Sequence, residues 1–155
     1  MKRLFKCLLL VLLFATTVPY TSCDMEIHDE LFSDGFSIPG TWLLEGPMGI
    51  YIYDDNYRYE IKKLYAIFYK NGDADFLAYS NDQLVGTFEG DWKSWLYTSY
   101  GAIELYLPEG AIEYDFKAGR EYSAVLEGRG GDVIMRRITD EAFYQASKGN
   151  PTPWE

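Results

Sequence analysis

The chain has 155 residues, of which 48 % are hydrophobic, and 14 Lys and Arg face 24 Asp and Glu, giving a formal net charge of -10. This length predicts one domain. The acidic charge argues against a nucleic-acid partner, because such binding needs clustered lysine and arginine to release phosphate counterions. With one histidine, His28, the sequence also argues against His-clustered metal sites and most histidine acid–base chemistry.

The first 22 residues predict an export signal. Lys2, Arg3 and Lys6 form a basic start, and an apolar run follows over residues 7–15. This is the pattern of a secretory signal peptide. The apolar run is about half of the roughly 20 residues needed to cross a bilayer, so we expect removal of residues 1–22 and not a membrane span.

Cys23 follows the small residues Thr21 and Ser22, with Tyr20 before them. This segment resembles the lipobox of bacterial lipoproteins, in which the cysteine is lipidated and becomes the first mature residue; the family usually has leucine where Tyr20 stands. The resemblance implies a chain held on a membrane by acyl chains on Cys23, two or more of which make anchoring stable. The alternative is an ordinary signal peptide that leaves Cys23 as a free thiol.

Residues 24–37 are acidic and lack regular periodicity, which predicts a solvated tether. With the lipidated Cys23 that the resemblance implies, this segment covers residues 23–37. The early acidic residues resemble the run that directs some Gram-negative lipoproteins to the outer surface; they are Asp24, Glu26, Asp29 and Glu30. We therefore expect an exported protein of the cell envelope, anchored in the outer membrane at its periplasmic face or at the cell surface. His28 lies in this tether, where solvation is its expected state.

From residue 38 to residue 155 the sequence predicts one domain, built mainly of strands. Short apolar and aromatic stretches alternate with Gly, Asn, Asp and Pro, which favours strands. The clearest hairpin pairs residues 64–70 with 75–80 through Asn71-Gly72, a dipeptide suited to the positive φ angles of a tight turn. A further turn at Asn81-Asp82 leads to a strand over 84–92.

The second half alternates apolar and polar residues over 103–107, 112–116 and 122–127. Each segment therefore predicts a strand with one wet face. The sequence predicts breaks between these strands at 108–110, 118–119 and 128–131. About eight to ten strands at this spacing indicate an all-β, antiparallel up-and-down meander that closes into a barrel, with a β-sandwich as the alternative.

One short helix is predicted after the last strand. Thr139 is a suitable N-cap, two acidic residues follow it in the first turn, and Gly149 is a suitable end. Phe143 and Ala146 lie three residues apart, which gives the helix a short apolar stripe against the sheet.

Gly40-Thr41-Trp42 opens the first predicted strand, and Arg136 and Arg137 end the last one. This resembles the lipocalin pattern, in which a basic residue stacks on the tryptophan by a cation–π interaction. The whole chain resembles small lipocalin-like lipoproteins of Gram-negative bacteria, which implies a calycin-type barrel closed at one end by these residues. The strand register decides which arginine covers Trp42, and the alternative role for Trp42 is a plain core residue.

Little in the sequence points to catalysis, a metal or a cofactor. The predicted domain lacks a histidine and a free cysteine, so the usual nucleophile–base pairs are absent. Residues 54–56 and 71–75 carry oxygen ligands but lack the ordered spacing of a calcium loop. We therefore expect a protein that is not an enzyme.

Tyrosine and tryptophan are the remaining chemical feature. We predict ligand contacts from Tyr65 and Tyr69 on one face of a strand, and from Trp92 and Trp95. The alternative is sheet packing with the hydroxyls in solvent. Because residues 64–69 are apolar on both faces, we expect a cavity on one side and the terminal helix on the other.

The leading functional hypothesis is a monomeric, membrane-anchored and non-catalytic protein that binds a small apolar or amphipathic ligand in the barrel mouth, as the resemblance implies. One alternative is a cell-surface module that binds glycans or proteins through exposed tyrosine and tryptophan. Another is a structural envelope protein without a small ligand.

Overall fold

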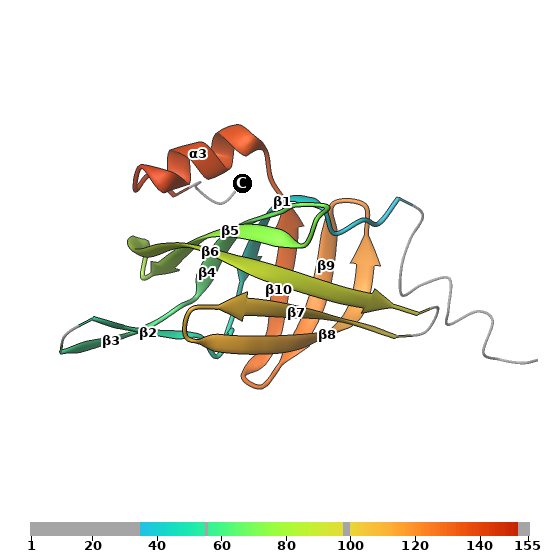
Figure 1. The fold of residues 1–155 in the computed structure, drawn as a ribbon, viewed down its shortest axis with the longest axis horizontal. Helices are drawn as coiled ribbons and strands as arrows, with labels where there is room; N and C mark the ends of the chain where they lie inside the picture. The colour runs from blue at the N-terminus through green and yellow to red at the C-terminus, as the bar shows by residue number, and fades with distance from the viewer. Residues whose placement is uncertain (1–34, 55, 98–99, 152–155) are drawn as a thin grey trace, which may run out of the picture.

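The computed structural model describes residues 35–54, 56–97 and 100–151. Within these residues ten strands and one helix follow each other along the chain (Figure 1). Their bounds are β1 Gly40–Glu45, β2 Tyr51–Asp54, β3 Tyr57–Glu60, β4 Lys63–Phe68, β5 Asp73–Ser80, β6 Gln83–Leu96, β7 Gly101–Leu107, β8 Gly110–Arg120, β9 Ser123–Gly128, β10 Gly131–Arg137 and α3 Asp140–Ser147.

Eight of the strands close into a barrel in the order β1-β10-β9-β8-β7-β6-β5-β4, and all neighbouring pairs are antiparallel. From β4 to β10 each strand pairs with the next one in the chain, and β1 closes the ring between β10 and β4. This up-and-down barrel confirms the predicted fold class. β2 and β3 form a separate two-stranded sheet in the connection from β1 to β4.

The predicted turns between β4, β5 and β6 are present. In the β4–β5 turn, Gly72 has a φ of +97°, and its amide donates to the carbonyl of Tyr69. In the β5–β6 turn, Asn81 and Asp82 have φ angles of +50° and +63°. Asn and Asp tolerate this left-handed region better than other side chains, so the sequence determines both turns locally.

The strands differ from the sequence prediction most clearly in three places. β8 continues through Ala118 and Gly119, where we predicted a break, because a register shift between Phe116 and Ala118 lets the strand bend without ending. β6 runs on to Leu96 and so exceeds the predicted 84–92. The hairpin of β2 and β3 was not predicted, since four-residue strands rich in tyrosine carry little apolar alternation.

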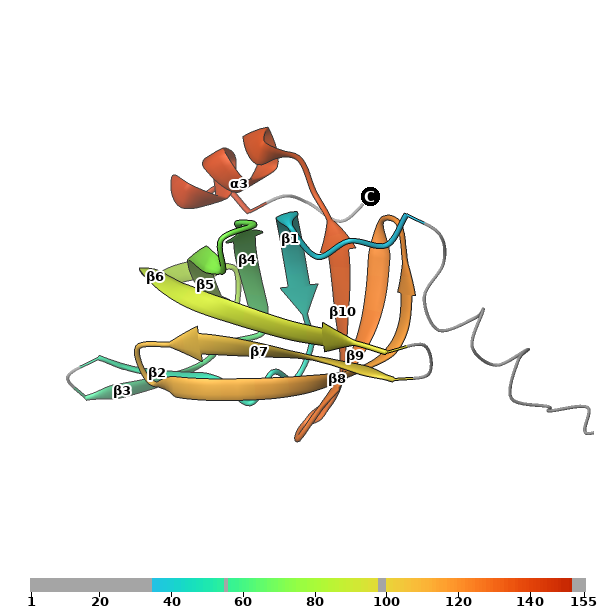
Figure 2. The same ribbon diagram turned by 45° about the vertical axis from the view of Figure 1, so that its right-hand side comes forward.

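Helix α3 is capped as the sequence predicts. The Thr139 side chain accepts a hydrogen bond from the amide of Ala142 at 3.1 Å, and Gly149 has a φ of +82° beyond the helix end. Ala146 is fully buried, and Phe143 packs against the same cluster. The helix therefore lies on the outer wall of the barrel near β4, β5 and β6 (Figures 1 and 2).

Candidate functional site

The barrel interior is packed with apolar side chains. The buried residues of this cluster are Ile38, Trp42, Leu44, Met48, Ile50, Ile52, Ile61, Leu64, Ala66, Phe68, Ala74, Phe76, Ala78, Ile103, Leu105, Leu107, Tyr114, Phe116, Ala124, Leu126, Val133 and Met135. None of them is more than 9 % exposed. Strand β6 contributes the partly buried Phe88 and Trp92. Such a core is the main source of the barrel's stability.

One end of the barrel is covered around Trp42, which is fully buried. Its indole Nε1 donates to the carbonyl of Ile38 at 2.6 Å, and the Phe36 ring lies 6.3 Å away from the indole between ring centres. Arg137 stacks above the indole, with its Cζ 4.3 Å from the ring centre. The Arg137 guanidinium also donates to the carbonyls of Ser37 and Pro39, so it ties the entering chain to the last strand.

The glycine before Trp42 has a steric role. Gly40 has a φ of +134°, and a Cβ at this position would lie 2.2 Å from the Arg137 Nη1. A side chain here would therefore push the guanidinium off the indole. The register also separates the two arginines: Trp42 pairs with Arg137, whereas Arg136 pairs with Leu43 and points to the opposite face.

The other end is covered by the long connection from β1 to β4. Met48, Ile50 and Ile61 of this connection are each at most 2 % exposed and belong to the interior cluster. The Tyr114 hydroxyl donates to the carbonyl of Met48 at 2.8 Å, and burial raises the pKa of this phenol. The connection is thus held over the barrel end by apolar contacts and one buried hydrogen bond.

A second apolar cluster lies on the outer wall beneath α3. Its buried members are Leu43, Tyr65, Leu77, Tyr79 and Ala146. The rings of Tyr65 and Tyr79 lie 5.3 Å apart, and the Tyr79 hydroxyl donates to the carbonyl of Ala146. Along the strands below α3, apolar residues therefore alternate between the barrel interior and the helix.

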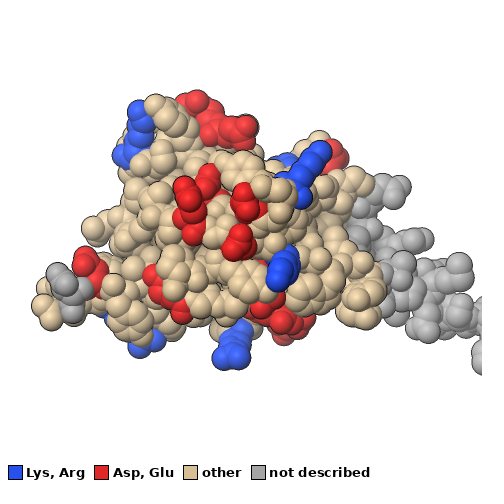
Figure 3. Space-filling model, in the orientation of Figure 1, with Lys and Arg blue, Asp and Glu red and all other residues tan. Residues whose placement is uncertain are grey.

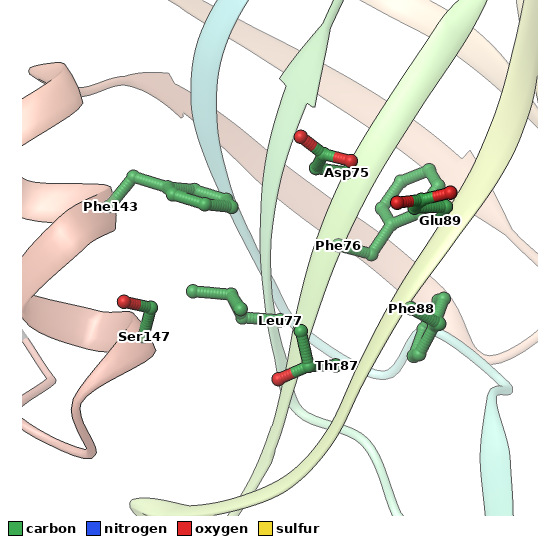
Figure 4. A pocket seen from close by; sticks show the side chains of 8 residues that line it. All are labelled: Asp75, Phe76, Leu77, Thr87, Phe88, Glu89, Phe143 and Ser147. Atoms are coloured by element: carbon green, nitrogen blue, oxygen red, sulfur yellow. The ribbon is translucent and has the colours of Figure 1, made fainter.

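The helix leaves part of this wall uncovered and forms a groove of about 470 Å³ with β5 and β6 (Figure 4). The groove is lined by Asp75, Phe76, Leu77, Thr87, Phe88, Glu89, Phe143 and Ser147. Phe143 and Ser147 approach from the helix, opposite Leu77 and Thr87 of the sheet (Figure 4). It is thus mainly apolar, with two carboxylates among its lining residues.

A second hollow, of about 560 Å³, shares Asp75 and Glu89 with the groove and is strongly acidic. The strand register sets Asp75 opposite Glu89 and Asp73 opposite Asp91. The acidic side chains gather over β5 and β6 (Figure 3). Like charges directly opposite each other destabilise a sheet. The ion pairs between described residues involve Lys62, Lys63 and Lys117, and none of them reaches these four carboxylates.

Tyr69 stands at the edge of the acidic hollow, where its hydroxyl donates to the Asp75 Oδ2 at 2.7 Å. This hydrogen bond, followed by partial desolvation, raises the pKa of Tyr69. The Trp92 indole donates to the Tyr69 carbonyl at 2.9 Å and packs 5.4 Å from Phe68 of the interior. Tyr69 and Trp92 are therefore in contact, and Tyr69 alone of the pair lines the hollow.

The other two predicted ligand residues lie elsewhere. Tyr65 is fully buried under α3 and faces away from the barrel interior. Trp95 is 37 % exposed and lies three positions beyond Trp92, on the other face of β6. The four aromatic residues thus do not form one site. Cys23 lies outside the described residues.

The groove residues were not predicted from the sequence. The available signal was the acidic alternation on two neighbouring strands, Asp73 and Asp75 on one and Glu89 and Asp91 on the other. The position of Phe143 depends on how α3 packs, which no local pattern gives.

Two groups of exposed aromatic residues lie outside the hollows just described. Tyr53 and Tyr57 of the β2–β3 hairpin are 69 % and 71 % exposed, and the Arg58 guanidinium lies over the Tyr51 ring. At the β6–β7 hairpin, Tyr97 and Tyr100 are 53 % and 60 % exposed, and their rings stack at 4.6 Å.

Within the described ranges, no group of three or more His, Cys, Asp or Glu residues is arranged to hold a metal ion. Across the same part of the chain, no helix is long and apolar enough to span a membrane.

No family model matches the chain, and no curated protein matches it either. Among solved structures, the chain is similar to a lipocalin-like protein from Bacteroides uniformis, with 22 % sequence identity and a TM-score of 0.39; the match covers 64 % of this chain and 97 % of that one. The closed antiparallel barrel with an arginine stacked on the first-strand tryptophan has the architecture that the lipocalin resemblance implied.

Proposed function

We propose that this chain is an exported, lipid-anchored protein of the cell envelope whose barrel binds a small amphipathic molecule without catalysis. We place the ligand in the groove between α3 and the outer faces of β5 and β6. The observation that carries this proposal is the groove itself, about 470 Å³ in volume, which brings Leu77 and Phe143 together with Asp75 and Glu89.

The size and lining of the groove define the class of ligand. Pockets for small molecules usually measure about 300–1,000 Å³ and are mainly apolar with a few placed polar groups. The partly buried Phe143 and the edge of the buried Leu77 line the groove with apolar surface. Asp75 and Glu89 offer negative charge that no described lysine or arginine neutralises in an ion pair. The complementary ligand has an apolar body and a cationic head.

The groove is a better location than the barrel interior. The side chains of the interior cluster are buried inside the barrel, and its ends are covered by Trp42 with Arg137 and by the Met48 segment. A ligand inside would displace side chains that are close to fully buried, at a cost of several kcal/mol of packing. A ligand in the groove displaces only solvent.

The binding test compares two amphiphiles with the same chain and opposite charge, dodecyltrimethylammonium and dodecyl sulfate, each below its micelle concentration. Isothermal titration of the purified protein is expected to detect the cationic amphiphile with at least tenfold tighter binding than the anionic one. Thr87→Trp fills the groove from an exposed position and is expected to weaken that binding at least tenfold.

Ile134→Trp is the matched control, because Ile134 is a neutral, 38 % exposed residue on β10, which does not line the groove. This control is expected to bind like the unmodified protein. Equal binding by the Thr87→Trp variant, or equal binding of both amphiphiles, contradicts the proposed site.

The proposed anchor is the lipid on Cys23, and its support is the resemblance of the Thr21-Ser22-Cys23 segment to a lipobox. Metabolic labelling with an alkyne fatty acid tests it. The unmodified chain is expected to carry the label and to fractionate with the outer membrane, whereas Cys23→Ala is expected to lose both properties. Protease treatment of intact cells then separates a cell-surface location from a periplasmic one.

A further inference from the structure

The β6–β7 hairpin ends in an uncharged aromatic tip. The ten residues 94–103 include no Asp, Glu, Lys or Arg, although charged residues make up 25 % of the chain. Its described, solvent-exposed members are Trp95, Leu96, Tyr97 and Tyr100, at 37–60 % exposure. We call these four residues the tip. An exposed apolar group of this kind on an acidic protein marks a contact surface.

The tip is preorganised. The Tyr97 and Tyr100 rings stack with their centres 4.6 Å apart and an interplanar angle of 26°. The Tyr97 amide donates to the Tyr100 carbonyl at 2.8 Å, which fixes the backbone at the same point. Aromatic side chains held in this way lose little conformational entropy when they bind a surface.

The tip lies at the end of the barrel where the chain enters from the N-terminal side. Gly35, the first described residue, lies beside Glu121 of the β8–β9 turn, and the Phe36 ring packs 5.6 Å from Phe116. In the antiparallel order, this turn, the β6–β7 tip and the start of β1 all belong to one end of the barrel. Figures 1 and 2 show the tip and the start of the described chain on the same side of the molecule.

We propose that the tip rests on the lipid bilayer and sets the orientation of the barrel on the membrane. This inference rests on the proposed lipid anchor at Cys23. The eleven residues between Cys23 and Gly35 span at most about 40 Å, at about 3.4 Å per residue. The tip is therefore kept within reach of the bilayer, and the tether alone does not fix which face of the barrel meets it.

The chemistry of the tip matches a bilayer surface. Tryptophan and tyrosine concentrate at membrane interfaces because each ring joins an apolar body to a polar tip. The absence of charge in residues 94–103 also matters. Without Lys2, Arg3 and Lys6 of the signal segment, the lipidated protein has 24 acidic and 11 basic residues, so the rest of its surface is repelled from anionic lipid.

The β2–β3 hairpin provides an internal comparison. It also exposes tyrosines, but Asp54, Arg58 and Glu60 lie among them. It belongs to the opposite barrel end, since it lies in the connection that follows β1 and precedes β4. Charged side chains resist burial in the interface, so this hairpin is expected to stay in water.

The test uses the full-length lipidated protein in phosphatidylcholine vesicles, with and without lipids that carry a doxyl quencher. An environment-sensitive NBD label is placed at Tyr100→Cys in the tip or at Tyr57→Cys in the β2–β3 hairpin; the two tyrosines are 60 % and 71 % exposed. Cys7 leaves with the signal segment and the Cys23 thiol carries lipid, so the introduced cysteine is the only free thiol. The unmodified protein, treated in the same way, checks that no other site is labelled.

We expect at least twofold stronger quenching at position 100 than at position 57. Equal quenching at both positions, or stronger quenching at position 57, overturns the orientation while leaving the anchor intact. If the protein does not float with the vesicles, the proposed anchor fails and this inference fails with it. Circular dichroism of each labelled variant checks that the barrel is folded.

Discussion

The barrel interior and the outer wall beneath α3 are both apolar, but the interior is enclosed by a ring of strands and covered at its ends, whereas one helix covers the outer wall. The same strands supply both regions, because alternate residues of β4 and β5 face inward and outward. Inside, eight strands and two covered ends leave every buried side chain in contact with others. Outside, one helix of eight residues covers the buried Leu77 and leaves the groove beside it, where Thr87 is exposed.

Because of this difference, we expect the interior to contribute mainly to stability and the groove to contribute mainly to ligand binding. A closed apolar region lowers the free energy of the folded state and has little surface left for a ligand. A partly covered region contributes less to stability and keeps apolar area that a ligand can bury. Substitutions inside the barrel should therefore change the free energy of unfolding, whereas substitutions in the groove should change binding more than stability.

The largest expected effect is that of Trp42→Ala. The indole is fully buried, stacks under Arg137 and donates a hydrogen bond to Ile38. Its loss leaves a cavity and an unpaired carbonyl, so we expect the free energy of unfolding to fall by about 3–5 kcal/mol. Urea denaturation followed by circular dichroism measures this. A loss below about 1 kcal/mol would show that the covered end is not part of the stable core.

Phe143→Ala is expected to weaken ligand binding more than it lowers the free energy of unfolding. Phe143 is partly buried and lines the groove. We expect a loss of about 1–2 kcal/mol of stability and a clear loss of affinity for dodecyltrimethylammonium in titration calorimetry. Tyr144→Ala in the same helix is the control, because Tyr144 is 51 % exposed and does not line the groove. If both variants bind equally well, the groove does not hold the ligand.

A double-mutant cycle between Trp42 and Arg137 should give a coupling of about 0.5–2 kcal/mol, the range of a cation–π pair. The cycle uses Trp42→Phe and Arg137→Ala, and chemical denaturation provides the four free energies. Arg136→Ala is the control, since the register places Arg136 on the other face of β10. Strictly additive losses for Trp42 and Arg137 would refute stacking as a source of stability.

The smallest effect concerns pH. Glu45 is buried at the end of β1, and desolvation raises its pKa despite the nearby Lys63. The folded state thus binds the Glu45 proton more tightly than the unfolded state, so this residue's contribution to stability falls as pH rises through its pKa. Relative to the unmodified protein, Glu45→Gln should gain stability between pH 4 and pH 7. If Glu45→Gln instead lost stability relative to the unmodified protein over that range, the pKa of Glu45 would not be raised in the folded state.

The strands and turns could be predicted because their determinants are local. Asn71-Gly72 and Asn81-Asp82 suit positive φ angles, and Thr139 caps the helix that follows it. The Gly40–Trp42 pattern also pointed to the covered end, although only the register shows that Arg137, and not Arg136, lies over the indole.

The candidate site could not be predicted because it depends on contacts between distant segments. Tyr79 and Ala146 are 67 residues apart, and their hydrogen bond helps to set α3 on the wall. This placement turns Tyr65, predicted to contact a ligand, into a packing residue, and it brings Phe143 to the groove. Alternation shows that a strand is apolar on both faces but not what covers each face.

The most direct test of the separation between a packed interior and an open groove is methyl NMR of the protein during titration with dodecyltrimethylammonium. Leu77 reports on the groove, and Leu44 and Leu126 report on the interior. We predict that the Leu77 methyl signals shift in a saturable manner while those of Leu44 and Leu126 stay in place. Shifts that begin at Leu44 and Leu126, with Leu77 unchanged, would show that the barrel opens and that the ligand binds inside it.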